Sequence, residues 1–275
     1  MNQTKILDVK VNEIITKEVL EKIKIFLLSD NQHYIVTLNP EMVVEAQKNN
    51  HFKKIINEAD LVVPDGIGIL FANKLLNHQA LPEKITGIDL IYRICESEFI
   101  KDKKIYLLGA GKGIAEKTAK VLSKKYDYLN IVGAEIGILN LEFGVWNKSQ
   151  NFQPKTGLLR IEKSKIQNSD NDKFHKLNKE LIKRIDKAQP DMLFVAFGAP
   201  KQEEWIYENL KKMPSVKLAI GVGGSFDFIS GKVKRAPLIF QKFGLEWLWR
   251  LILEPRRIKR IYNATVKFGW MVLKK

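Results

Sequence analysis

The sequence predicts an α/β fold with a largely parallel sheet. Two observations support this prediction: short apolar runs alternate with helical stretches along most of the chain, and several of the runs end in turns rich in Gly or Pro. The chain has 275 residues, of which 45% are hydrophobic and 28% charged. This length and composition suit one large domain, alone or with an appendage.

The predicted elements follow one another in a regular order. Pro40 opens a helix after the first strand, and residues 87–100 and the stretch after Gly113 are also predicted to be helical. The polar stretch 148–178 has few apolar residues and is predicted to be a loop or insertion. Six apolar runs are predicted to be buried strands: 34–38, 60–63, 104–108, 130–132, 191–197 and 218–222.

Composition limits where the protein works. Cys95 is the only cysteine, so the chain forms no internal disulfide and no cysteine-based zinc site, which fits a reducing cytoplasm. The N-terminus lacks the apolar core of a signal peptide, and no apolar run approaches the ~20 residues that span a bilayer. We therefore expect a cytoplasmic protein that does not cross a membrane.

Most of the positive charge lies at the C-terminal end. Residues 232–275 contain twelve Lys or Arg and two acidic residues, a net charge of +10 within the chain's +15. We predict two parts: an α/β core, 1–231, and a basic C-terminal segment, 232–275. Such a charge excess indicates contact with an anionic partner, either lipid headgroups or nucleic acid, although a solvated helical face would also explain it.

The C-terminal segment (232–275) also has an amphipathic pattern. Its apolar residues recur at helical spacing before Pro255 interrupts the helix, and three of the five tryptophans lie in the last 29 residues. Trp beside Lys and Arg on amphipathic helices is typical of a membrane headgroup interface. The alternative is a helical hairpin whose apolar stripe packs on the core, and both can hold together.

Two predicted loops at strand ends contain residues suited to binding or catalysis. Thr37 and Asn39 leave a strand just before a helix N-terminus, where an anion is favoured, although Asn39 could simply cap the helix. Asp65, between Pro64 and Gly66, could accept a proton from an attacking hydroxyl or could serve only as a turn residue. Ligands of open α/β sheets usually bind at this edge.

Two further loops contain residues suited to phosphate. Gly109 and Gly111 fall between a strand and a helix, where glycine lets the backbone approach a phosphate closely, although the spacing matches neither a dinucleotide fingerprint nor a P-loop. Lys201 and Gln202 follow the most apolar strand and could meet diphosphate oxygens. Trp205 is predicted to pack inward.

Metal-binding patterns are weak. The sequence 170–172 spells the Asp-x-Asp pattern by which many sugar transferases hold a metal, but it lies in the polar stretch with no strand before it, and we interpret it as solvated loop. The four histidines lack metal-ligand spacing. We expect no metal site and no cofactor.

Seven motifs, taken in order, resemble the WecG/TagA/CpsF family of bacterial glycosyltransferases. The resemblance runs from about residue 8 to 273, without the polar stretch. The matching segments are TLNPEMV (37–43), ADLVVPDGIG (59–68), KITGIDLI (84–91), YLLGAGKG (106–113), FGAPKQEEW (197–205), GVGGSFDFISGKVKRAP (221–237) and GLEWLWRLILEPRRIKR (244–260).

The resemblance implies a Rossmann-like core and an inverting transfer of a sugar from a UDP donor. The expected sugar is N-acetylmannosamine, a related N-acetylhexosamine or its uronic acid, and the expected acceptor is polyprenyl-diphosphate-linked N-acetylglucosamine. It further implies that Asp65 is the general base and that Thr37 and Asn39 position the substrates. Lys84 stands where the family often has Arg, so a bidentate diphosphate contact would become a point charge.

The resemblance also implies how the nucleotide is held. Gln202 and Asp227 would line the nucleotide-sugar pocket, and the C-terminal segment would contact the membrane and reach the diphosphates. Because no credible metal motif is present, the leaving-group charge would be met by backbone N–H groups and basic side chains. The arginines that the resemblance assigns to this task are Arg250, Arg257 and Arg260.

The expected partners are therefore a UDP-sugar, the lipid-linked acceptor and the anionic inner face of the plasma membrane, in the synthesis of a cell-surface polysaccharide. We expect no nucleic acid, and a homo-oligomer is compatible with the sequence. Three alternatives stay open: transfer of another hexose, a dinucleotide-dependent nucleotide-sugar enzyme, and a nucleic-acid-binding module. The dinucleotide enzyme requires an acidic residue closing a second strand, and we expect neither Asp127 nor Glu135 to do so.

Overall fold

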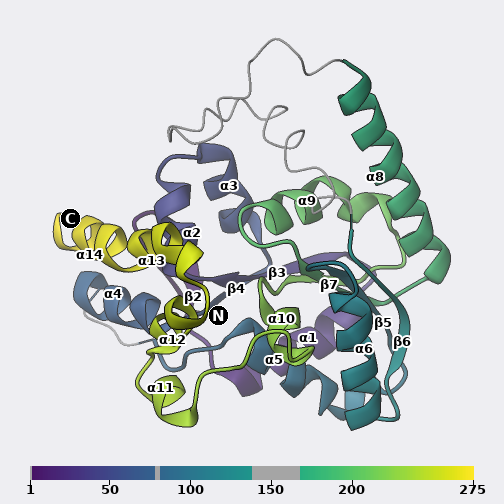
Figure 1. Cartoon of the computed structure of the whole chain (residues 1–275), viewed down its shortest axis with the longest axis horizontal. Coiled ribbons are helices and arrows are strands. Elements are labelled where there is room, and N and C mark those ends of the chain that lie inside the picture. The colour runs from purple at the N-terminus through teal and green to yellow at the C-terminus, as the bar shows by residue number, and fades with distance from the viewer. Residues whose placement is uncertain (1, 78–80, 138–167) are drawn as a thin grey trace.

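The computed structural model describes residues 2–77, 81–137 and 168–275. Its centre is a six-stranded sheet in which all neighbouring strands are parallel (Figure 1). This arrangement confirms the predicted α/β class. The strands, in spatial order, are β4 (Leu61–Pro64), β3 (His33–Leu38), β8 (Leu218–Gly221), β7 (Met192–Ala196), β5 (Lys104–Gly109) and β6 (Asn130–Glu135).

Helices cover both faces of the sheet, and each face has its own cluster of buried apolar side chains. Buried strands of this kind are predicted well because both of their faces are apolar. One face is covered by α1 (Thr16–Leu28), α5 (Gly87–Cys95), α6 (Ile114–Lys125) and α10 (Ser225–Ile229). The other is covered by α2 (Pro40–Ala46), α3 (Asn50–Glu58), α8 (Asn168–Ala188) and α9 (Lys201–Asn209).

An N-terminal hairpin that the sequence analysis did not predict packs beside the sheet. Its strands β1 (Gln3–Ile6) and β2 (Val9–Asn12) are antiparallel. The side chain of Asn12 accepts a hydrogen bond from Val62 N at 2.7 Å, which attaches the hairpin to the outer strand β4. Three short elements complete the core: α4 (Ile67–Asn77), η1 (Glu98–Ile100) and η3 (Leu210–Lys212).

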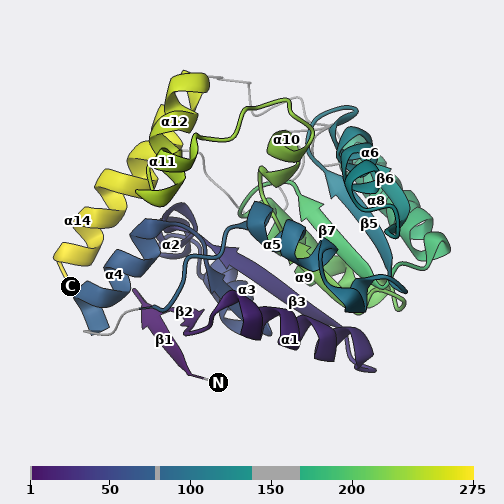
Figure 2. The same ribbon diagram turned by 90° about the horizontal axis from the view of Figure 1, so that it is seen from below.

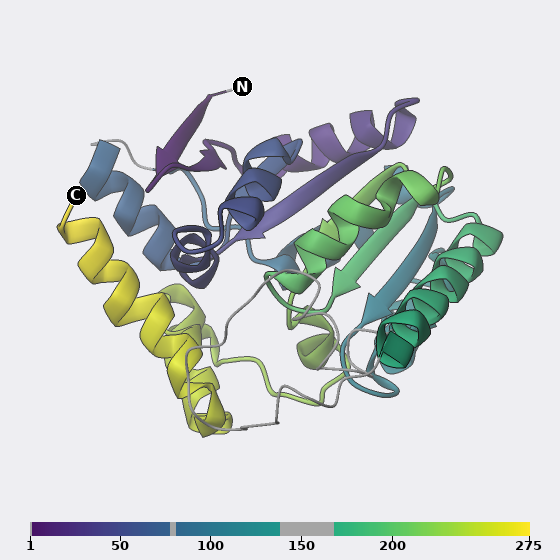
Figure 3. The same ribbon diagram turned by 90° about the horizontal axis from the view of Figure 1, so that it is seen from above.

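The C-terminal segment (232–275) is helical and lies along α4 (Figures 2 and 3). Phe268 and Val272 are buried in the core cluster, so the last helix is packed against the core. The predicted break at Pro255 is confirmed, because α12 ends at Leu253. The elements are α11 (Leu238–Lys242), α12 (Glu246–Leu253), η4 (Pro255–Arg257), α13 (Ile258–Tyr262), the π-helical η5 (Asn263–Lys267) and α14 (Phe268–Leu273). Among the described residues, no helix is both long and apolar enough to span a bilayer.

Two sequence interpretations are wrong. Residues 168–178, interpreted as loop together with the Asp-x-Asp pattern at 170–172, belong to α8. Phe174, Leu181 and Ile185 bury one face of this helix, and their apolar spacing was obscured by the polar residues between them. Residues 148–167 of the predicted insertion lie outside the described residues. Glu135, expected not to close a strand, is the last residue of β6.

We predict that Gly109→Ala is more destabilising than Gly113→Ala. Both glycines have positive φ, 116° and 75°, which is unfavourable for Ala. A Cβ on Gly109 would also lie 2.8 Å from the Ala196 backbone, whereas a Cβ on Gly113 meets nothing within 4 Å. Urea denaturation should give a loss of about 1–3 kcal/mol in Gly109→Ala, beyond that of Gly113→Ala. Equal losses would contradict the close approach of β5 to β7.

Candidate active site

Two cavities meet at Asp65 on the edge of the sheet where the strands end. The first, about 520 Å³, is lined by the loops that follow β3, β4, β5, β7 and β8, and we call it the polar cavity. The second, also about 520 Å³, lies between α4 and the helices α12–α14, and we call it the apolar cavity. Both volumes are typical of small-molecule sites. The cavities share Asn39, Asp65, Gly224, Phe228, Glu246 and Arg257.

Hydrogen bonds of the backbone fix Asp65 at this junction. Its own N–H donates to Leu38 O at 2.7 Å, and Ile85 N donates to Pro64 O at 2.8 Å. The pKa of Asp65 is raised to about 7, chiefly by burial and also by the neighbouring Glu246, while Lys84 and the Gly87 N–H act in the opposite direction. A carboxyl group with a pKa near neutrality can exchange a proton with a bound ligand at physiological pH.

Thr37 and Asn39 line the polar cavity, and both also have local structural partners. The Thr37 hydroxyl donates to Gly221 O at 2.9 Å and thereby joins the ends of β3 and β8. Asn39 Oδ1 accepts from Met42 N at 3.1 Å, which confirms that Asn39 caps α2. The same Asn39 borders both cavities, so the capping role leaves it next to a ligand.

Gln202 joins two of the loops that form the polar cavity. Its Oε1 accepts from Gly198 N at 3.1 Å and from Gly223 N at 2.9 Å, and its Nε2 donates to Glu203 Oε1 at 2.7 Å. Glu203 is fully buried, and burial raises its pKa to about 8. Gly221 is needed here, because a Cβ would lie 2.7 Å from Gln202 Nε2. Gln202 therefore holds the shape of the cavity.

A group of arginines from the C-terminal segment faces the cavities. Arg257 and Arg260 line the polar cavity, and Arg250 lines the apolar one. Burial lowers the pKa of Arg257, and the nearby charges of Arg250 and Arg260 lower it further. Arg260 is held by Glu41 through three contacts of 2.8 to 3.0 Å. Such crowding of like charges favours an anionic ligand.

Asp227 anchors this group from the core. Its carboxylate lies 3.1 Å from Lys232 and 3.5 Å from Arg250, and Arg250 stacks on the Phe228 ring. Asp227 also lines the polar cavity, so it both orients cations and borders the ligand space.

The structure brings most of the predicted residues together. Gly109 and Lys201 lie outside the lining of both cavities. Lys84 borders the apolar cavity, where its ammonium lies 3.1 Å from Glu246 of the C-terminal segment. Trp205 is fully buried, as predicted. The predicted residues that line the polar cavity are Thr37, Asn39, Asp65, Gly111, Gln202, Asp227, Arg257 and Arg260.

Several residues at the site were not predicted from the sequence. Glu246 lies in the matched segment 244–260, but no pattern in the sequence indicated its partners in the core. Lys232 and Ser225 also line the polar cavity, and basic character alone could have indicated Lys232. Within the described parts of the chain, no group of three or more His, Cys, Asp or Glu side chains is arranged to hold a metal ion.

Comparisons with known proteins identify the family of the chain. Residues 4–275 match the Glycosyl transferase WecG/TagA/CpsF family. An N-acetylglucosaminyldiphosphoundecaprenol N-acetyl-beta-D-mannosaminyltransferase of Bacillus spizizenii is 31% identical over 241 residues, covering 88% of this chain and 79% of that protein. A Staphylococcus aureus protein of the same name is 31% identical over 263 residues, covering 95% and 89%.

We predict that Asp65→Asn stabilises the fold above neutral pH. Because the folded-state pKa is about 7 against 3.8 for the free side chain, the folded chain retains a proton that the unfolded chain loses. The contribution of Asp65 to wild-type stability therefore falls as the pH rises from about 4 to 7. Thermal unfolding should show a higher midpoint for Asp65→Asn at pH 8, with the gain shrinking toward pH 4. A gain independent of pH would contradict the raised pKa.

Proposed function

Because the chain belongs to the WecG/TagA/CpsF family of glycosyltransferases, we propose that it transfers N-acetylmannosamine, or a related N-acetylhexosamine or its uronic acid, from a UDP donor to a lipid-linked N-acetylglucosamine. The observation that supports this most is the position of Asp65, at the junction of a polar cavity and an apolar one. The reacting hydroxyl of an acceptor that is half sugar and half lipid would lie at such a junction.

The proposed chemistry is a single displacement with inversion. The acceptor hydroxyl oxygen attacks the anomeric carbon of the sugar, the bond from that carbon to the UDP oxygen breaks, and Asp65 takes the hydroxyl proton. A pKa of about 7 suits this role, because it balances the ionised fraction against base strength. Thr37 and Asn39 would position the substrates beside this carboxylate.

The departing diphosphate needs positive charge and hydrogen-bond donors. Arg257, Arg260 and Lys232 border the polar cavity, together with the glycine-rich backbone at 110–111, 198 and 223–224. Cations fixed before the reaction stabilise charge that develops in the transition state without further reorganisation. We assign the UDP portion of the donor to this cavity, with Gln202 maintaining the shape of its loops.

The lipid portion of the acceptor fits the apolar cavity. Phe71, Leu75, Trp247, Phe268 and Leu273 border it. Two elements beside it carry exposed apolar side chains: Ile67 and Phe71 on α4, and Trp270 and Leu273 on α14. The two helices lie side by side (Figure 3). We propose that this face rests peripherally on a membrane, with the basic residues of the C-terminal segment against anionic headgroups.

One observation favours the dinucleotide-dependent alternative. Glu135 closes β6, the strand after the glycine-rich turn, where such enzymes place the acid that binds a ribose. Here, however, its carboxylate is paired with Arg184 at 2.7 Å and accepts from the Tyr106 hydroxyl. It also lies outside the lining of the polar cavity. The glycosyl transfer therefore remains the function that we propose.

We predict that Asp65→Asn lowers sugar transfer about 100-fold or more without weakening UDP binding, because the variant loses the base but keeps the cations. A panel of UDP-sugars, assayed with a short-chain diphosphate-linked N-acetylglucosamine, measures transfer and identifies the donor. Calorimetry measures UDP affinity. Asp102→Asn, exposed and outside both cavities, serves as the control. Full turnover by Asp65→Asn would remove Asp65 from the base role.

We predict that Trp270→Ser with Leu273→Ser weakens binding to anionic phospholipid vesicles by about 10-fold or more, because each side chain contributes about 1.5–3 kcal/mol when buried. The two side chains are 61% and 75% exposed on α14. Leu28→Ser is the matched control, since Leu28 is 70% exposed at the end of α1, away from the C-terminal segment (Figure 2). Equal co-sedimentation of all three proteins would refute the membrane face.

A further inference from the structure

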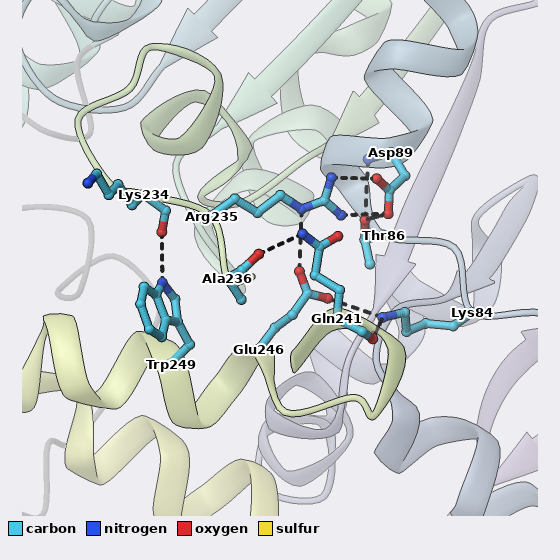
Figure 4. A network of polar contacts seen from close by, with 9 residues as sticks. All are labelled: Lys84, Thr86, Asp89, Lys234, Arg235, Ala236, Gln241, Glu246 and Trp249. Carbon is cyan, nitrogen blue, oxygen red and sulfur yellow. Dashed lines mark hydrogen bonds and ion pairs between the residues drawn. The ribbon is translucent and has the colours of Figure 1, made fainter. Parts of the chain in front are cut away.

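Four charged side chains fasten the C-terminal segment to the core (Figure 4). We call Lys84, Asp89, Arg235 and Glu246 the latch. Arg235 contacts both oxygens of Asp89, at 2.7 and 2.8 Å, and approaches Glu246 Oε1 at 3.4 Å. Lys84 Nζ lies 3.1 Å from Glu246 Oε2 and 3.4 Å from Gln241 O. Glu246 therefore forms ion pairs with both cations of the latch, Lys84 and Arg235.

The latch lies directly against the proposed base. Ile85, the residue after Lys84, donates its N–H to the carbonyl of Pro64, the residue before Asp65. Lys84, Asp65 and Glu246 all line the apolar cavity. Lys84 therefore has three carboxyl groups in its electrostatic surroundings, those of Asp65, Asp89 and Glu246, and the structure pairs its ammonium with Glu246.

We infer that Glu246 is a positioning residue for the transfer reaction: by binding the Lys84 ammonium it leaves the Asp65 carboxylate available to take the acceptor's proton. The inference rests on the proposed role of Asp65. It also assigns Lys84 to the latch rather than to the diphosphate. Since Glu246 lies on α12, docking of the C-terminal segment and preparation of the base become one event.

Electrostatics around Asp65 agree with this assignment. Burial is the largest cause of its raised pKa; Glu246 and Asp89 act in the same direction, while Lys84 and the Gly87 N–H oppose them. Without Glu246, the Lys84 ammonium would be free to pair with Asp65, which would make that carboxylate a weaker base. Other charged groups bordering the two cavities are Glu41, Asp227, Lys232, Arg250, Arg257 and Arg260.

The test compares pH–rate profiles of the full-length protein in the sugar-transfer assay. In Glu246→Gln, the acid limb of kcat should move down by about one pH unit, and the plateau should fall about 10-fold. In Lys84→Gln, the acid limb should move to higher pH, because the cation that lowers the pKa of Asp65 is lost. In the double variant, which loses both charges, the limb should return toward the wild-type position and kcat should partly recover.

A purely structural role gives a different pattern. Trp249→Phe is the anchoring control, because it removes the hydrogen bond from Trp249 Nε1 to Lys234 O and leaves the latch charges in place; it should not move the acid limb. If Glu246 only anchors the segment, Glu246→Gln loses activity without a shift of the limb, and the double variant is no better. An unshifted acid limb in Glu246→Gln, or a double variant without recovery of kcat, overturns the inference.

The same assay separates this inference from the proposed function. Turnover retained in Asp65→Asn would refute the base role itself, whatever the latch variants do. An inactive Asp65→Asn with an unshifted Glu246→Gln profile would refute only the latch.

Discussion

The parallel pairing of the strands is the constraint on which the site depends. Because β4, β3, β8, β7 and β5 run in the same direction, their carboxyl ends meet at one edge, and residues far apart in sequence share a cavity. Two side chains stabilise this edge: Thr37 joins β3 to β8, and Gln202 joins the loops after β7 and β8. Asp65 therefore projects from a rigid frame.

A rigid frame lets opposite electrostatic conditions exist a short distance apart. Asp65 has a raised pKa, because it is desolvated and faces Glu246. The polar cavity, by contrast, collects Lys232, Arg257 and Arg260. In the proposed reaction, the base that accepts a proton and the pocket that stabilises an anion need these different surroundings. In the proposed arrangement, the pairing of Lys84 with Glu246 keeps the Lys84 ammonium from pairing with the Asp65 carboxylate.

The sequence predicted the strands well, because buried parallel strands are apolar throughout, and it placed Asp65 and Gln202 in loops that line one cavity. It failed where the signal depends on tertiary contacts. The α8 helix has a narrow apolar stripe of Phe174, Leu181 and Ile185, of which only Phe174 falls within the polar stretch 148–178. Lys84 and Glu246 are 162 positions apart, and ion pairs at such separation leave no local pattern.

The two acidic residues of the C-terminal segment orient some of the basic side chains that give the segment its net charge of +10. Glu246 binds Lys84 and Arg235, whereas Glu254 binds Arg250 and Arg257, so each acid orients two cations. Residues without such partners would be free to lie against lipid, whereas Arg250 and Arg257, which Glu254 orients, border the cavities. Removing either acid would therefore alter the position of the cations more than their number. In the proposed reaction, that position decides whether a cation assists the leaving group or makes Asp65 a weaker base.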